Sequence, residues 1–151
     1  MATADVRVIT VEPHRIAAVR MRTTLANLGK TIRQGLNQVW PDIIERSGLN
    51  VVLYHPSEPT GLGHEFEIET GVQVAPGFVA KPPVYLTATP GGRVVTAAHF
   101  GPYEQLKNTY DAIDAYVRGH GLKLAGPSWE VYGHWHDDVA KVRTDVFFPI
   151  A

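Results

Sequence analysis

The sequence predicts an α+β fold made of two similar halves, with an antiparallel sheet and two helices on one face. Two observations support this prediction. Strand-like stretches are interspersed with two amphipathic helical stripes. The two halves of the chain also share one order of elements: strand, turn, strand, helix, strand, turn, strand. We expect a single domain over residues 1–151, made of two pseudo-repeats at about residues 5–75 and 84–150, with a ligand cleft on the face opposite the helices.

Composition narrows the functional classes. The chain has 151 residues, of which 44% are hydrophobic, so it can bury a core as one domain. Its net charge of −1 provides no basic field for a nucleic acid. The absence of cysteine excludes disulfides, thiolate catalysis and cysteine-based zinc sites. Without a signal peptide or an apolar run of about 20 residues, we expect a cytoplasmic protein with no membrane association.

The first half begins with two strands and a helix. Residues 6–11 and 15–22 form two predicted strands, and a turn at residues 12–14 joins them into a hairpin. The next apolar residues step by three or four positions, which predicts a helix with Thr24 as its N-cap. Its stripe consists of Leu25, Leu28, Ile32, Leu36, Val39 and Ile43. Pro41 should kink or end this helix, because proline has no backbone N–H.

Two more strands complete the first half. Residues 51–54 form a short apolar strand, and a turn-rich surface loop follows at residues 55–63. Apolar and polar residues alternate along residues 65–74, which predicts a half-buried strand. Its glutamates, Glu65, Glu67 and Glu69, share one face. We interpret this as a solvated face that could pair with Arg20 and Arg22, although Glu67 could reach the cleft as a second acid.

The second half repeats this order after a connector rich in proline and glycine at residues 75–83. Residues 84–89 and 93–100 are predicted strands around a tight turn at residues 90–92. Pro102 opens a helix whose stripe ends before Gly119 and Gly121. Residues 128–135 and 142–150 are the last two strands.

The stretch Ser128–Trp135, S-W-E-V-Y-G-H-W, carries the strongest functional signal. Strand side chains alternate between faces, so Trp129, Val131 and Trp135 share an apolar face. Glu130, Tyr132 and His134 share the other face, which we predict to line the cleft. The alternative is that Glu130 is an ordinary solvated strand residue.

Three motifs in the second half resemble a known family. They are A-A-H-F-G-P-Y-E-Q-L-K-N-T-Y-D-A-I-D-A-Y, then G-P-S-W-E-V-Y, then T-D-V-F-F-P-I. In order and spacing they resemble the GyrI-like small-molecule-binding domain, the effector-binding module of multidrug-sensing regulators. The resemblance implies a duplicated β-α-β-β plan with two SHS2-like halves, and a cleft for hydrophobic, aromatic and often cationic compounds. It maps the usual charged contact to Glu130 and the tyrosine of the same motif to Tyr132. Because the chain opens with a strand and shows no helix-turn-helix module, we expect a free-standing form.

The predicted ligand-binding residues come from both halves. They are Glu130, Tyr132, Tyr54, Trp129, Tyr103 and His99. Tyr54 is included because it matches Tyr132 in the repeat alignment, whereas Trp40 is assigned to helix packing. The predicted function is drug or toxin binding, for sensing or sequestration, with Glu130 as counter-charge and aromatic rings as walls.

Two other functions remain open. One is a hydrolase that opens cyclopropane-containing DNA-alkylating natural products, with Glu130 as general base and Tyr132 as a hydrogen-bond donor to the substrate carbonyl. The other is a gyrase-inhibitor-like protein that binds another protein. We predict no metal, because His134 and His136 lack an assigned third ligand, and no cofactor, because nothing singles out His99 or His120 as a haem ligand. The expected partner is a small hydrophobic ligand, and exposed sheet edges could support a homodimer.

Overall fold

The computed structural model describes residues 5–43, 48–55, 64–134 and 136–151. The chain forms two compact units, which are described separately. Unit 1 consists of residues 1–12 and 90–151, and unit 2 consists of residues 13–89. Most of the predicted loop at residues 55–63, and Trp135 of the focal stretch, lie outside the described residues.

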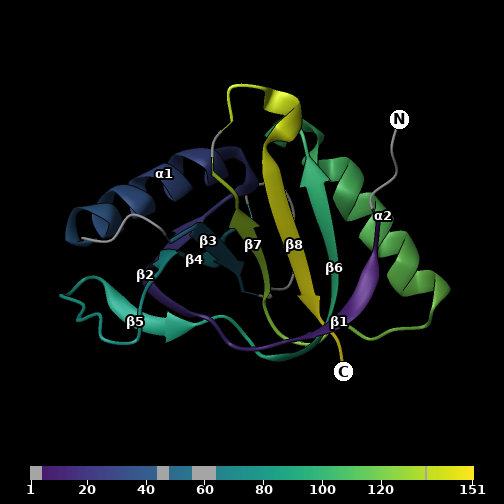
Figure 1. Ribbon diagram of the computed structural model, residues 1–151, viewed down its shortest axis with the longest axis horizontal. Helices are drawn as coiled ribbons and strands as arrows, with labels where there is room; N and C mark the ends of the chain where they lie inside the picture. Colours follow the sequence, from purple (N-terminus) through teal and green to yellow (C-terminus); the bar gives the residue numbers. More distant parts are fainter. Residues whose placement is uncertain (1–4, 44–47, 56–63, 135) are drawn as a thin grey trace. The chain divides into compact units, whose positions relative to one another are not determined.

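The described residues of unit 1 form four strands and one α-helix. The strands lie in the order β1-β6-β8-β7, and each neighbouring pair is antiparallel (Figure 1). Their bounds are Arg7–Val11 for β1, Gly92–Phe100 for β6, Ser128–Tyr132 for β7 and Arg143–Pro149 for β8. A short 3-10 turn, η3 (Tyr103–Gln105), leads into the helix α2 (Leu106–Gly119), and η4 (Val139–Lys141) precedes β8. The core forms where Ile113 and Val117 of α2 pack on Val95, Ala97 and Val146.

The described residues of unit 2 likewise form four strands and one α-helix. Its antiparallel strands lie in the order β3-β4-β2-β5. Their bounds are Asn50–Tyr54 for β3, Phe66–Gln73 for β4, Arg15–Thr23 for β2 and Tyr85–Ala88 for β5. The helix α1 (Leu28–Val39) follows η1 (Leu25–Asn27) and gives way to η2 (Trp40–Asp42). The prediction that Pro41 ends the regular helix is confirmed, since Pro41 lies at the start of η2.

The fold class is confirmed, but the predicted hairpin of residues 6–22 is wrong, and the strands on either side of the predicted tight turn at residues 90–92 are not sheet neighbours either. β1 pairs with β6, and β5 pairs with β2, so neither strand pairs with the strand that follows it in the chain. Both short connections contain a proline, Pro13 or Pro90, and neither supplies the two left-handed residues that a tight hairpin turn uses. An alternating pattern specifies which residues share a face, but it does not specify the partner strand.

In each unit the helix covers one face of the strands. In unit 1 this face carries Val95, Ala97 and Val146, and in unit 2 it carries Ala17, Val19 and Val72. None of the described helices has the length and hydropathy that a membrane span requires. Each site residue can therefore be assigned either to the face that the helix covers or to the opposite face of its unit.

Candidate functional site

Glu130 is the central residue of the candidate site in unit 1. It lies on β7 and is only 3% exposed. Both of its carboxylate oxygens accept hydrogen bonds from phenols: Tyr132 donates to Oε1, and Tyr110 donates to Oε2. A buried charge is costly unless polar groups replace its lost water. The two phenols provide that replacement within unit 1.

The strand and the helix together place these phenols. Tyr132 follows Glu130 by two residues on β7, so both side chains point to one face, as the sequence predicts. Tyr110 lies on α2, three residues before Ile113, on the side that packs against the strands. Its ring also meets Phe148 edge-on, with centroids 5.8 Å apart, which helps to hold the phenol above β7.

Tyr103 adds a third aromatic ring. It meets Tyr132 edge-on, with ring centroids 5.8 Å apart and planes at 85°. Tyr103 is 46% exposed, so it is the outermost ring of the group. Burial of the rest of its side chain raises the pKa of Tyr103 above its ordinary value. We call Tyr103, Tyr110 and Tyr132 the tyrosine cluster.

The predicted face of Glu130 is corrected by the structure. Glu130 pairs with Val146 on β8, and Val146 belongs to the core beneath α2. Glu130 therefore lies on the face that the helix covers, not on the face opposite the helix. Alternation separates the two faces of a strand, but only the packing of α2 decides which of them lies beneath the helix.

Trp129 occupies the other face of β7 and is not brought together with Glu130. It is buried and stacks on Phe147, with ring centroids 4.9 Å apart and planes at 12°. Trp129 therefore lies on the face away from α2, because its neighbour Glu130 lies on the face that the helix covers. Tyr54 lies in unit 2, where it ends β3 and pairs with Ile68 of β4.

His99 is held by its own unit. Its Nε2 lies 2.9 Å from the carbonyl oxygen of Pro102, and its Nδ1 lies 3.1 Å from the hydroxyl of Thr109. Because a carbonyl can only accept, Nε2 donates to Pro102, while the hydroxyl of Thr109 hydrogen-bonds with Nδ1. Both nitrogens are thus satisfied by η3 and α2 neighbours, which indicates a structural role for His99.

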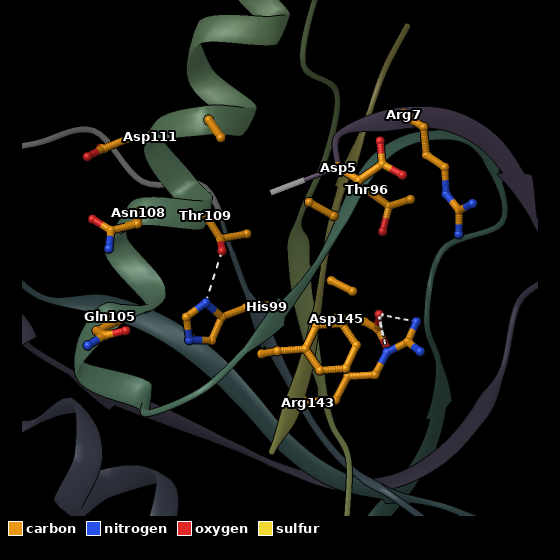
Figure 2. Close-up of a pocket in the computed structure, with 14 residues that line it drawn as sticks. Asp5, Arg7, Thr96, His99, Gln105, Asn108, Thr109, Asp111, Arg143 and Asp145 are labelled. Carbon is orange, nitrogen blue, oxygen red and sulfur yellow. Dashed lines mark hydrogen bonds and ion pairs between the residues drawn. The ribbon is translucent and has the colours of Figure 1, made fainter. Parts of the chain in front are cut away.

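His99 also lines a pocket of about 680 Å³, and Figure 2 shows the side chains around it. Gln105, Asn108 and Thr109 line its helical wall. Across from them, Arg143 donates two hydrogen bonds to Asp145 Oδ1, at 3.1 Å from Nε and 3.0 Å from Nη2. Neither Glu130 nor the tyrosine cluster lines this pocket. It is therefore distinct from the predicted carboxylate site.

Unit 2 contains a buried carboxylate that the sequence interpretation missed. Glu69 on β4 is only 7% exposed, so its assignment to a solvated face is wrong. His55 Nε2 lies 2.6 Å from its Oε1, and the phenol of Tyr85 donates to its Oε2. Burial, together with this hydrogen bond, raises the pKa of Tyr85. Glu69 faces away from α1, because its neighbour Thr70 points toward Gly35 of that helix.

The remaining glutamates of this face behave as predicted. Glu67 pairs with Arg20 at the surface, and Arg22 lies within 3.8 Å of Glu65 and 3.6 Å of Glu67. The contribution of Tyr110 could have been inferred from the sequence: a phenol in an otherwise apolar helical stripe needs a polar partner when it is buried. The burial of Glu69 carries no comparable local signal.

A family model provides the decisive comparison. The model of the GyrI-like small molecule binding domain matches residues 4–151. This chain belongs to that family. The predicted membership of the GyrI-like family is therefore confirmed over nearly the whole chain.

Solved structures share the GyrI-like fold at low sequence identity. The C-terminal domain of EcmrR is 20% identical and has a TM-score of 0.71, with 99% of each chain covered. SAV2435 bound to tetraphenylphosphonium is 9% identical with a TM-score of 0.70, covering 97% of this chain and 94% of that one. A hydrolase from Listeria innocua is 14% identical with a TM-score of 0.65, covering 100% and 94%. None of the curated proteins matches the sequence significantly.

No metal-binding arrangement occurs among the residues that the structure describes, where no three His, Asp or Glu side chains come together as ligands. His134 and His136 are both exposed. Within this part of the GyrI-like domain, the buried titratable groups are instead engaged with phenols, imidazoles or hydroxyls.

Proposed function

We propose that this GyrI-like domain binds hydrophobic, aromatic and often cationic small molecules, for drug or toxin sensing or sequestration, with Glu130 as the counter-charge. The observation that carries the proposal is the position of Glu130 within the tyrosine cluster: a nearly fully buried carboxylate that receives two phenol hydrogen bonds. Such a carboxylate is screened little by water, so it attracts a cation more strongly than a surface acid does.

The surrounding rings favour a cation whose charge is delocalised. Tyrosine faces can each contribute roughly 0.5–2 kcal/mol to binding a cation. Both oxygens of Glu130 already accept hydrogen bonds, so a cation need not bring N–H donors to be stabilised. Tetraphenylphosphonium, which is bound to the structurally similar SAV2435, is a cation of this kind. This similarity supports the ligand class that we propose.

Calorimetric titration with tetraphenylphosphonium tests the proposal. We expect Glu130→Gln to weaken binding at least about tenfold, because the isosteric amide removes the charge but keeps the shape. Asp111→Asn is the matched control, since it removes one negative charge from an exposed position on the same helix as Tyr110. Equal affinity of the wild type and Glu130→Gln would remove Glu130 from the proposal.

A second candidate function uses the same carboxylate as a general base. A carboxylate oxygen keeps a lone pair after accepting one hydrogen bond, so Glu130 could take a proton from water. The water oxygen would bond to a ring carbon of a cyclopropane-bearing substrate, while the ring bond breaks toward a carbonyl that becomes a phenolate. The proton on Glu130 then returns to that phenolate, so the reaction adds one water overall. Structural similarity to a hydrolase from Listeria innocua is consistent with this chemistry.

Mass spectrometry separates turnover from binding. Incubation with a synthetic cyclopropane-fused cyclohexadienone should yield a product heavier by one water with the wild type and not with Glu130→Gln. Unchanged substrate with the wild type, together with Glu130-dependent binding of tetraphenylphosphonium, would leave binding as the function.

A further inference from the structure

His99 links separate elements of unit 1. It lies on β6 and is only 6% exposed, and Figure 2 shows its imidazole beside Thr109 of α2. Its Nδ1 lies 3.1 Å from the hydroxyl of Thr109, and its Nε2 donates across 2.9 Å to the carbonyl oxygen of Pro102. Pro102 directly precedes η3, the short turn that carries Tyr103. The imidazole therefore connects β6 both to the helix and to the start of this turn.

The turn η3 is held mainly by hydrogen bonds. None of its residues is buried, so apolar packing does not fix it. Gln105 N donates within the turn to the Pro102 carbonyl at 3.0 Å, and Gly101 N donates to Val142 O at 2.9 Å just before the turn. Gly101 has a φ of 124°, which residues other than glycine rarely adopt, so the chain changes direction there. The hydrogen bond from His99 to the Pro102 carbonyl therefore helps to fix where η3 lies relative to β6.

The position of η3 sets the position of Tyr103. Tyr103 is the first residue of the turn, and its ring meets that of Tyr132 edge-on, with 5.8 Å between the centroids. Tyr132 in turn donates to Glu130. Tyr103 is exposed, so a ligand that approaches the tyrosine cluster from solvent can contact this ring. A shift of η3 would move the outermost ring of the cluster away from Tyr132.

Unit 2 contains the corresponding link without an aromatic ring. Its strand β2, turn η1 and helix α1 follow one another as β6, η3 and α2 do in unit 1. Here Thr23 of β2 makes the link, because its hydroxyl lies 2.8 Å from that of Thr31 on α1 and donates to the carbonyl oxygen of Thr24 at 3.2 Å. Leu25, the first residue of η1, is 81% exposed. Both units therefore contain the link, but only in unit 1 does it place a ring against the phenol that bonds to Glu130.

We propose that His99 is a positioning residue of the Glu130 site. By donating to the carbonyl of Pro102, it holds η3 so that the ring of Tyr103 forms the outer wall against which an aromatic cation packs. His99 itself does not touch the ligand, because both of its nitrogens are engaged within unit 1. This inference rests on the proposed binding function and adds to it the residue that sets the outer wall.

Calorimetric titration with tetraphenylphosphonium tests this role in a double-mutant cycle. Tyr103→Ala should weaken binding about three- to tenfold, since it removes one aromatic contact with the cation. We expect His99→Asn to weaken binding by a similar factor, because its shorter amide replaces Nδ1 but leaves the Pro102 carbonyl without a side-chain donor. The double variant should bind no more weakly than Tyr103→Ala alone, because His99 acts through that ring.

Two further variants serve as matched controls. His99→Gln places an amide N–H near the position of Nε2, so it should recover most of the affinity that His99→Asn loses. Thr23→Val removes the corresponding link in unit 2, so it should lower the urea midpoint without changing the affinity. If His99→Asn does not fold, Thr109→Val takes its place in the cycle, because it removes the hydroxyl that orients the imidazole. The same non-additivity with Tyr103→Ala is then expected.

The outcomes separate this role from the binding function. If the losses of His99→Asn and Tyr103→Ala add in the double variant, the positioning role is overturned while the Glu130 site stands. An unchanged affinity of His99→Asn, or an equal loss in His99→Gln or Thr23→Val, overturns it in the same way. If the wild type does not bind tetraphenylphosphonium, the binding function falls, and the positioning role falls with it.

Discussion

Glu130 in unit 1 and Glu69 in unit 2 are two buried strand carboxylates with similar hydrogen bonding and different surroundings. Each accepts a phenol hydrogen bond on one oxygen. On the other oxygen, Glu130 accepts from Tyr110, a second phenol, whereas Glu69 meets the imidazole of His55. Glu130 lies on the helix-covered face of its unit, and Glu69 lies on the face away from its helix.

This difference distinguishes a carboxylate that two phenols of its own unit contact from one that contacts a phenol and an imidazole. Glu69 has a titratable imidazole at 2.6 Å and faces the side of β4 where Arg20 pairs with Glu67. Within unit 1, Glu130 accepts hydrogen bonds from the phenols of Tyr110 and Tyr132, which carry no positive charge. Burial of a carboxylate alone therefore does not identify a binding site. The polarity and charge of its neighbours distinguish the two cases.

The strongest test of this comparison neutralises each carboxylate in turn. Glu130→Gln should weaken tetraphenylphosphonium binding at least about tenfold, whereas Glu69→Gln should leave the affinity unchanged. Glu69→Gln should instead lower the free energy of unfolding by about 1.5–3 kcal/mol, as for loss of a hydrogen bond to a charged group. Calorimetry and urea denaturation measure the two effects. A loss of affinity in Glu69→Gln as large as in Glu130→Gln would break the comparison.

Removing one phenol hydroxyl that donates to each carboxylate should have the next largest effect on stability and binding. Tyr110→Phe and Tyr85→Phe should both reduce the free energy of unfolding by about 1–3 kcal/mol, because each leaves a buried carboxylate with one donor fewer. Only Tyr110→Phe should also weaken tetraphenylphosphonium binding, by several-fold, since Tyr110 fixes the orientation of Glu130. Paired urea and calorimetric titrations test this. Equal affinities for the two variants would show that Tyr110 supports the fold and not the ligand site.

The surface pair of Arg20 and Glu67 should give the smallest effect. The hydrogen bond from Arg20 holds the pKa of Glu67 below its usual value, and the same bond raises the pKa of Arg20. A lowered carboxyl pKa stabilises the folded state above the ordinary glutamate pKa, and that contribution is lost as the pH falls through the lowered value. The urea midpoint of the wild type should thus exceed that of Glu67→Gln slightly at pH 7. The difference should shrink in acid and in high salt, and a constant difference would rule out the ion pair as its cause.

Local sequence patterns were sufficient to predict several features of the site and the fold. Alternation along Ser128–Trp135 places Glu130 and Tyr132 on one face, and Tyr132 does donate to Glu130. The end of the regular helix before Pro41 follows from the missing N–H of proline. The family resemblance likewise depends on motifs that are short and contiguous, and the family model confirms it. Each of these features involves residues within one or two turns or strands of one another.

The sequence by itself therefore determined most of the helices and strands, the family and the placement of Glu130 and Tyr132 on one strand face. The tertiary structure decided which strands pair, since β1 joins β6 and β5 joins β2 across long stretches of chain. It also decided that α2 covers Glu130 and brings Tyr110 to it, and that His55 and Tyr85 enclose Glu69. The physical reason is that periodicity specifies the two faces of an element, whereas the contacts of each face depend on residues distant in the chain.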